Sequence, residues 1–517
     1  MRPAWTMALA ILLATSATVR GQDNRPRGPE SKSQEEKPKE EAAVPVPPET
    51  TSVTKHDLIL GGQVIHYTAT AGNLLIRDDQ DRPDASVFYV AYTQDGADSK
   101  SRPITFFYNG GPGAATIWLH MGSFGPVRVL TRSPEASGPA PYKWVPNDYS
   151  LLDKSDLVFI DAPLCGFSRA VGKGTVKDFA GTDQDIRAFR RVIERYITVN
   201  QRWISPKFLF GESYGTTRSA GLVAALQNDG VPFNGVVLLS SILNYGIRNA
   251  GYDTESISYL PSFAAIGYYH KKVKVQGSLA EWVQQAREYA RGPYSQALAK
   301  GDRLPQGELE SVANQVAALT GLSVEYLRET RLRIAAGRFR KELLRDDDRT
   351  LGRYDARFMG WDPDAAGETP GFDPSDTGIS GAFVGAFHDY IQHELKYMSQ
   401  EPYYTSGPGV NQAWDFKHQA SGSGKSPQPA PDTAVDLADA MRKNPGLRVF
   451  SANGYFDLAT PFFATEYDLS HMSLPPALVR NVEFGYYPAG HMVYLNVDAL
   501  KEMKGDLTKF YAEATHN

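Results

Sequence analysis

Short, mostly apolar runs separated in several places by helical stretches constrain most strongly how this sequence can fold. The runs do not alternate apolar and polar residues, which is typical of parallel strands covered by helices on both faces. The helical stretches between them include residues 182–199 and 216–226. The runs are Ile104–Tyr108, Leu157–Ile160, Phe208–Phe210, Val236–Leu239, Leu447–Phe450 and Val482–Tyr486. We therefore predict an α/β fold with a doubly wound, mostly parallel sheet.

Upstream of these runs, from about Lys55, the pattern changes to one of alternating β-branched and aromatic residues. Glycine-containing turns at residues 61–62, 71–73 and 95–96 punctuate it. This combination predicts antiparallel strands joined by tight turns. The expected strands are His56–Leu60, Gln63–Tyr67, Leu74–Arg77 and Ser86–Tyr92.

Residues 246–432 interrupt the strand pattern with helical patterns. We interpret them as a helical cap inserted between two parts of the sheet domain, residues 53–245 and 433–517; the alternative is an independent helical domain with no bearing on a functional site. The insertion ends in a Gly-, Ser- and Pro-rich stretch, 421–432, which predicts a flexible, exposed linker. The expected helices are 279–298, 306–319, 323–343 and 382–398.

The N-terminus has the pattern of a signal peptide. Arg2 precedes an apolar run, 5–14, that is interrupted only by Thr6, and small residues follow up to residue 21. This predicts export to the periplasm or secretion, with no stable membrane insertion after signal removal. Because the run is short for a bilayer span, an uncleaved anchor is the weaker alternative. Residues 22–52 are rich in Pro, Glu and Lys and predict a disordered tether.

Charge and cysteine content exclude several classes of protein. The net charge of −5 gives no sign of a strongly basic protein, so we expect neither nucleic acid nor an anionic membrane as the main partner. Cys165, the only cysteine, allows no internal disulfide and no thiolate zinc cluster. We expect it to be a small buried hydrophobic residue, although a place near the active-site wall is the alternative.

Ser213 is the candidate nucleophile. It lies in Gly211-Glu-Ser213-Tyr-Gly215, directly after one of the buried runs and directly before a helical stretch. The flanking glycines leave room for the sharp turn that exposes such a serine, and the following helix N-terminus presents free N–H groups. A glycine-rich strand-to-helix turn without catalytic function is the alternative.

Asp457 and His491 are the candidate acid and base. Each follows a predicted strand near the C-terminus, and the order Ser213, Asp457, His491 is the one expected of α/β-hydrolases. The alternatives are a loop histidine bonded to the backbone and an aspartate serving a turn or a helix cap. For the oxyanion hole we predict the backbone N–H groups of Tyr214 and Gly111, unless the glycine-rich loop around Gly111 is only a turn.

These motifs resemble the serine carboxypeptidase family, in what looks like its bacterial branch. The matching segments are Asn109-Gly-Gly-Pro-Gly113, Gly211-Glu-Ser-Tyr-Gly215, Gly454-Tyr-Phe-Asp457 and Ala489-Gly-His-Met492. The resemblance implies that Asn109 and Glu212 bind the C-terminal carboxylate of a peptide substrate and that Glu212 is protonated when it does so. An ordinary hydrogen-bonded glutamate in the turn is the alternative for Glu212.

Ser123 departs from the family pattern, because it stands where many members carry a second glutamate that shares this proton. We therefore expect a pH profile that is broader and shifted toward neutral. The implied function is a serine-type carboxypeptidase that acts on peptides with a free C-terminus, through an acyl-enzyme and with no metal or organic cofactor. An esterase or acyltransferase on the same fold, a non-catalytic binding protein, and an exported structural protein that uses the tether as a spacer are the alternatives.

Overall fold

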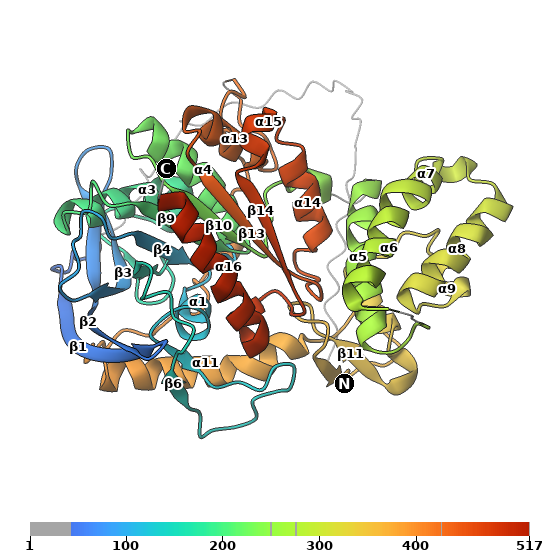
Figure 1. Cartoon of the computed structure of the whole chain (residues 1–517), viewed down its shortest axis with the longest axis horizontal. Coiled ribbons are helices and arrows are strands. Elements are labelled where there is room, and N and C mark those ends of the chain that lie inside the picture. The colour runs from blue at the N-terminus through green and yellow to red at the C-terminus, as the bar shows by residue number, and fades with distance from the viewer. Residues whose placement is uncertain (1–42, 249–250, 275–276, 425, 516–517) are drawn as a thin grey trace, which may run out of the picture. The chain divides into compact units, whose positions relative to one another are not determined.

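The computed structural model describes residues 43–248, 251–274, 277–424 and 426–515 (Figure 1). The predicted signal peptide, 1–21, and residues 22–42 of the predicted tether lie outside the described part of the chain. Within the described part, no helix combines the length and the apolar character needed to cross a membrane.

A single large sheet organises the chain, and it confirms the predicted fold class. Its strand order is β1-β2-β3-β7-β4-β9-β10-β13-β14, with β8 added beside β3. The pairs from β7 to β14 are parallel, whereas β1, β2, β3 and β7 pair antiparallel. The strands are β1 (Thr51–Leu60), β2 (Gln63–Arg77), β3 (Pro83–Gln94), β4 (Ile104–Tyr108), β7 (Asp156–Ile160), β8 (Arg169–Ala170), β9 (Lys207–Glu212), β10 (Gly235–Leu239), β13 (Arg448–Gly454) and β14 (Val482–Tyr487).

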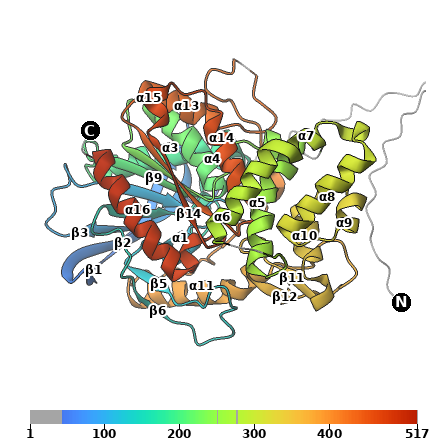
Figure 2. The same cartoon turned by 45° about the vertical axis from the view of Figure 1, so that its right-hand side comes forward.

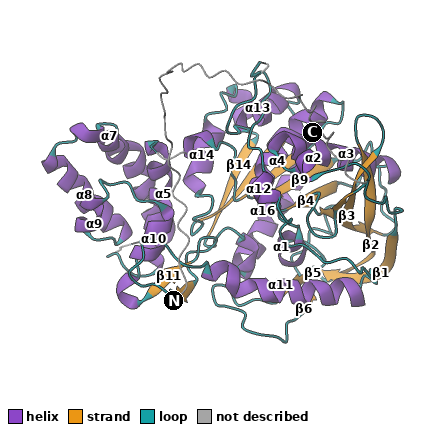
Figure 3. Ribbon diagram, turned by 180° about the vertical axis from the view of Figure 1, so that it is seen from behind, coloured by secondary structure: helices purple, strands orange, loops and turns teal. Residues whose placement is uncertain are grey.

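Helices cover both faces of the sheet (Figure 3). Side chains alternate along each strand, so that Phe106 packs in one hydrophobic cluster and Phe107 in the other. The first cluster contains residues of α3 (Thr182–Val199), α4 (Tyr214–Asn228) and α13 (Ala434–Lys443). The second contains residues of α1 (Ile117–Gly122), α11 (Pro374–His393) and α16 (Val497–Thr515). This two-sided burial explains why the central strands are apolar without alternation.

The N-terminal strands differ from the prediction in two places. Residues 71–73 do not form a turn, because β2 continues through them, and Asn73 instead pairs with Thr50: Asn73 N donates to Thr50 O (3.1 Å) and Thr50 N donates to Asn73 Oδ1 (2.8 Å). Order therefore begins earlier than Lys55. Val44 also forms a backbone bridge with Gly172, so the last residues of the predicted tether are fixed to the sheet domain.

The inserted region has its own core, formed by helices that lie to one side of the sheet in Figure 1. The helical stretch expected at 323–343 is broken in two, and a short hairpin, β11–β12, interrupts a region where no strands were expected (Figure 2). Not all residues of the predicted cap belong to this core. Helix α11, which lies within the predicted cap, packs instead on the face of the sheet that α1 and α16 cover. The elements are α5 (Asp253–Tyr269), α6 (Leu279–Tyr289), a π-turn (Ala290–Tyr294), α7 (Ser295–Leu298), α8 (Gln306–Thr320), α9 (Val324–Glu329), α10 (Ala336–Glu342), β11 (Arg349–Leu351) and β12 (Met359–Trp361).

The remaining elements are short, apart from α14, and lie in the connections. The stretch 421–432, predicted as a flexible linker, is held at its start, where Ser421 N donates to Asp436 Oδ1 (2.8 Å), and in its second half, where Gln428 pairs with His418 and Asp432 pairs with Asn244. These elements are β5 (Val127–Val129), β6 (Trp144–Pro146), α2 (Val176–Phe179), α12 (Val410–Ala413), α14 (Phe462–Ser470) and α15 (Pro476–Val479).

Cys165 is buried in the cluster that contains Phe106. Burial raises the pKa of its thiol to about 12, so the side chain is neutral at physiological pH. The interpretation of Cys165 as a small buried hydrophobic residue is therefore confirmed.

Candidate active site

Ser213 occupies a strained turn between β9 and α4. Its backbone angles, φ 60° and ψ −130°, are rare for a residue with a side chain, and the residue stays partly exposed. Neighbouring backbone atoms leave no room for a side chain at either flanking glycine. A Cβ at Gly211 would lie 2.2 Å from Gly215 O, and one at Gly215 would lie 2.9 Å from Tyr108 O. The turn thus presents Ser213 at the carboxyl end of the central strands.

Asp457 and His491 form a buried pair on the loops that follow β13 and β14. His491 Nδ1 lies 2.7 Å from Asp457 Oδ2, and the two side chains are 2% and 1% exposed. The other carboxylate oxygen of Asp457 accepts from the backbone N–H groups of Ala459 (2.7 Å) and Thr460 (3.0 Å), and Thr460 Oγ1 donates to Asp457 Oδ2 (2.7 Å). This network fixes the carboxylate and leaves His491 Nε2 available to accept a proton.

Residues 353–357 of the inserted region hold both of these loops. His491 N donates to Tyr354 O (2.5 Å), and Leu458 N donates to Arg353 O (3.0 Å). The guanidinium of Arg357 pairs with buried Asp355 (2.6 Å) and donates to Pro488 O (2.9 Å). Sequence reasoning missed this brace, because nothing in the local pattern indicates that the β11–β12 connection reaches the C-terminal loops.

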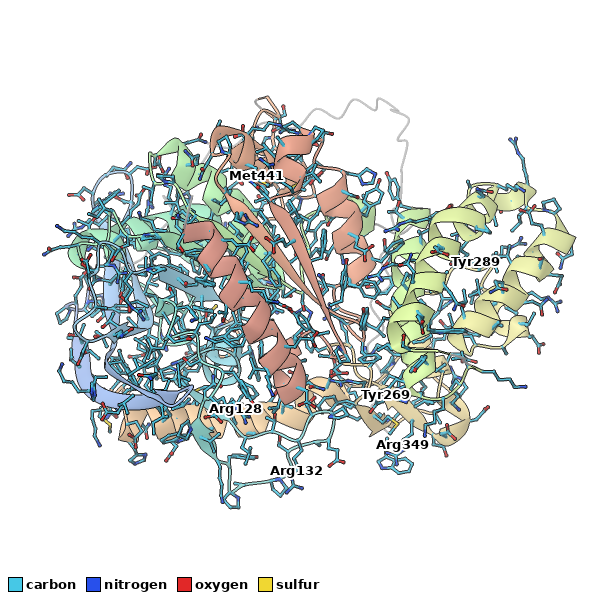
Figure 4. All side chains as sticks on the ribbon, in the orientation of Figure 1. Arg128, Arg132, Tyr269, Tyr289, Arg349 and Met441 are labelled. Atoms are coloured by element: carbon cyan, nitrogen blue, oxygen red, sulfur yellow. The ribbon has the colours of Figure 1, made fainter. Side chains whose placement is uncertain are left out.

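A second contact from the inserted region supports the Asp457 loop. Tyr269, labelled in Figure 4, is the last residue of α5 and packs against Phe456, with 5.4 Å between ring centroids. Phe456 itself belongs to the hydrophobic core of the insertion. The insertion is therefore packed against the loop that carries the candidate acid.

A fully buried arginine lies beneath the Ser213 turn. Arg218, on the first turns of α4, forms a bidentate pair with Asp185 of α3 (2.7 and 3.0 Å) and donates to Asn109 O (2.8 Å). The rings of Phe189, Tyr108 and Tyr214 surround its guanidinium. One side chain thus joins α4, the helix that follows the candidate nucleophile, to the loop after β4.

The two predicted oxyanion donors lie on adjoining backbone segments. Tyr214 is the first residue of α4, where the N–H group has no partner within the helix. The loop after β4 touches this point, because a Cβ at Gly110 would lie only 2.4 Å from Tyr214 N. Gly111 follows with φ 105° and lines the same cavity as Ser213. The two candidate donors therefore lie on backbone segments that are in direct contact.

Glu212 and Asn109 also line this cavity. Burial raises the pKa of the Glu212 carboxyl to about 7, although the charge of His491 acts in the opposite direction. Asn109 Oδ1 accepts from Leu119 N (2.9 Å), which turns the amide NH₂ group away from α1. Ser123 Oγ donates to Leu119 O (2.6 Å), so its proton is used at the end of α1. Glu212 can therefore carry a proton near neutral pH without a second glutamate.

The cavity has a volume of about 570 Å³, and the structure brings most of the predicted site residues to it. Asn109, Gly111, Glu212, Ser213 and His491 line it, whereas Asp457 lies behind His491 and the Tyr214 ring packs away against Trp414. Sequence reasoning missed several lining residues from the insertion and from α1, which no local motif marks. These are Trp118, Arg353, Tyr354, Asp376, Ser380 and Val384.

Known proteins resemble parts of this chain. The model of the serine carboxypeptidase family matches residues 64–276. The pheromone-processing carboxypeptidase KEX1 of Saccharomyces cerevisiae is 29% identical over 212 residues. This alignment covers 37% of the chain and 27% of KEX1, so the chain matches about a quarter of that relative's length.

A solved structure shares the fold over a longer part of the chain. The crystal structure of Kex1(delta)p, a prohormone-processing carboxypeptidase from S. cerevisiae, has a TM-score of 0.53 at 17% identity. The match covers 86% of this chain and 91% of that one. The shared fold is that of α/β hydrolases, and it extends beyond the segment that the sequence comparison covers.

We expect Arg218→Met to destabilise the protein by about 3–5 kcal/mol, because it leaves the buried Asp185 carboxylate without its partner. The free energy of unfolding from urea titration measures this. The double variant R218M/D185L should recover much of the loss. Arg338→Met, which removes an ion pair whose side chains are 44% and 75% exposed, should cost less than about 1 kcal/mol. Equal unfolding midpoints for R218M and R338M would contradict the interpretation.

We also expect the rate at which a fluorophosphonate labels Ser213 to fall as the pH drops through the pKa of His491, which lies above 6.5. Burial lowers the pKa of His491, but the carboxylates of Asp457 and Glu212 outweigh this effect and raise it above the ordinary 6.5. Protonated His491 cannot accept the serine proton, so labelling is lost on the acid side. Asp457→Asn should move this limb to lower pH and slow labelling by roughly 10³–10⁴-fold.

The matched control is Asp436→Asn, which alters a similarly buried pair, His418–Asp436 (2.8 Å), that does not line the cavity. It should leave the pH dependence of labelling unchanged. An acid limb that stays in place in the Asp457 variant would show that Asp457 does not control the ionisation of His491.

Proposed function

We propose that this chain, whose residues 64–276 match the model of the serine carboxypeptidase family, is a serine carboxypeptidase that removes C-terminal amino acids from peptides. The observation that carries the proposal is the position of Glu212 and Asn109. Both line the same cavity as Ser213, and Glu212 directly precedes it in the chain. A group that binds a carboxylate next to a nucleophile selects the last peptide bond of a substrate.

In the proposed reaction, Ser213 Oγ attacks the carbonyl carbon of the terminal peptide bond. His491 Nε2 accepts the serine proton and then gives it to the leaving amine, while Asp457 holds the imidazole through Nδ1. The amides of Gly111 and Tyr214 stabilise the oxyanion. Water, deprotonated by His491, then hydrolyses the acyl-enzyme and releases the shortened peptide. The residues of this scheme complete the reaction without a metal or organic cofactor.

Binding of the substrate carboxylate requires a donor rather than a second negative charge. Protonated Glu212 donates one hydrogen bond, and the Asn109 amide donates another. Because the Glu212 pKa is about 7, this protonated form is available at neutral pH, in agreement with the expected shift of the pH profile. The remaining wall, which includes Trp118 and Val384, contacts the side chain of the terminal residue.

The place of action is part of the proposal as well. The apolar run 5–14 supports export through a signal peptide that is then removed. The Pro-, Glu- and Lys-rich residues after it serve as a tether in front of the sheet domain. Assignment to the bacterial branch of the family stays a prediction from the motifs.

A blocked dipeptide with a free C-terminus and its C-terminal amide test the proposal. We expect the acid to be cleaved and the amide to be spared, and KM for the acid to rise as the pH increases through about 7, where Glu212 ionises and repels the substrate. Glu212→Gln, which mimics the protonated form, should keep KM nearly constant over this range. Measured kcat and KM values from pH 5 to 9 give the answer.

Ser213→Ala is the control for contaminating peptidases and should abolish cleavage. Equal cleavage of acid and amide would favour an endopeptidase or amidase, and hydrolysis of esters alone would favour the esterase alternative. A sharp fall of kcat/KM above about pH 5 would contradict the expected broader pH profile shifted toward neutral.

A further inference from the structure

Tyr494 lies behind Glu212 and has no role in the scheme above. It follows the His491 loop, is 2% exposed, and does not line the cavity. Its hydroxyl oxygen is buried without a hydrogen-bond partner among the described residues, and the same holds for Glu212 Oε2. A buried phenol and a buried carboxyl oxygen that both lack partners are costly, so their coincidence calls for a function.

The two groups are neighbours. Tyr494 contributes a hydrogen-bonding interaction that lowers the pKa of Glu212, and Glu212 in turn raises that of Tyr494. Because neither oxygen has a hydrogen-bond partner among the described residues, each is available to the other when Glu212 is ionised. Asn109 interacts with both of them, so the three side chains form one group at the base of the cavity.

The position of the Tyr494 ring is fixed by α1. A Cβ at Gly122 would lie 2.5 Å from Cε2 of Tyr494, so the ring fills the space that a side chain at residue 122 would need. Phe383 of α11 closes the same side, 3.1 Å from that Cβ position. The phenol is therefore a rigid donor, since a ring packed in this way cannot move away from Glu212.

We propose that Tyr494 is a positioning residue for Glu212: its hydroxyl donates to the ionised carboxylate from behind the cavity and sets the pH at which Glu212 stops accepting substrate. This inference rests on the proposed function. When Glu212 is protonated, its proton points to the substrate carboxylate. When the proton leaves, the phenol stabilises the anion, and the site closes to carboxylates at a lower pH than it would without Tyr494.

Other charged groups around Glu212 stay the same in a Tyr494 variant. His491 and Asp457 act on it from the loops after β14 and β13, and Tyr354 faces it from the inserted region. Arg353 acts on His491 and Tyr354 from the outer part of the cavity. A change seen on removing the Tyr494 hydroxyl alone therefore reports on the Tyr494–Glu212 contact.

Tyr494→Phe keeps the ring and removes only the hydroxyl. In the wild type, KM for the blocked dipeptide rises along an alkaline limb as Glu212 ionises. We expect this limb to lie about one pH unit higher in the variant, the size expected for losing one hydrogen bond to a charged group. The double variant Y494F/E212Q should show no such shift relative to E212Q. Tyr487→Phe, which removes another buried hydroxyl, bonded to Asp506 (3.0 Å), is the matched control and should leave the limb in place.

A merely structural role would change kcat or stability without moving this limb, and an unmoved limb in Y494F would overturn the proposal. Infrared difference spectra give a readout that does not depend on peptidase activity. The Glu212 carboxyl band, identified by its loss in E212Q, should titrate at higher pH in Y494F than in the wild type. If the wild type fails to cleave the dipeptide, the proposed function falls, whereas this titration still decides the role of Tyr494.

Discussion

The buried Arg218–Asp185 pair is the interaction on which the geometry of the site depends. It connects α3, α4 and the loop after β4, and the last two of these carry the candidate nucleophile and both candidate oxyanion donors. An arginine suits this position because its planar fork satisfies a carboxylate and a backbone carbonyl at once, and its faces stack on three aromatic rings. The strained backbone of Ser213 persists because packing on both sides leaves it no alternative.

Desolvation determines the chemistry of the cavity. Glu212, His491 and Asp457 are all buried, so each charge strongly affects its neighbours. Burial alone would keep His491 neutral and Glu212 protonated, whereas the carboxylates act to charge His491. The site therefore contains an imidazole, His491, and a carboxyl group, Glu212, whose ionisations are linked. Titration of one necessarily alters the other.

Local sequence predicted those features that local structure determines. Short-range patterns and chain order were enough to predict the apolar strands, the Gly-Glu-Ser-Tyr-Gly turn, and the positions of Asp457 and His491 after their strands. Contacts between distant segments could not be predicted in this way. Residues 353–357 meet the C-terminal loops only in the folded chain. Asn73, where a turn was expected, is held in strand β2 by its hydrogen bond to Thr50. The ring of Tyr494 occupies the space that the missing side chain of Gly122 leaves open.

The brace formed by residues 353–357 limits how freely the insertion can be exchanged. Insertions in loops are usually modular, since they can be lengthened, shortened or transplanted without disturbing their host. Here the carbonyl groups of Tyr354 and Arg353 provide acceptors for backbone N–H groups of the His491 and Asp457 loops. A chimera that replaces the insertion with one from another protein of this fold would have to reproduce this short segment, or it would fold with the His491 and Asp457 loops unsupported.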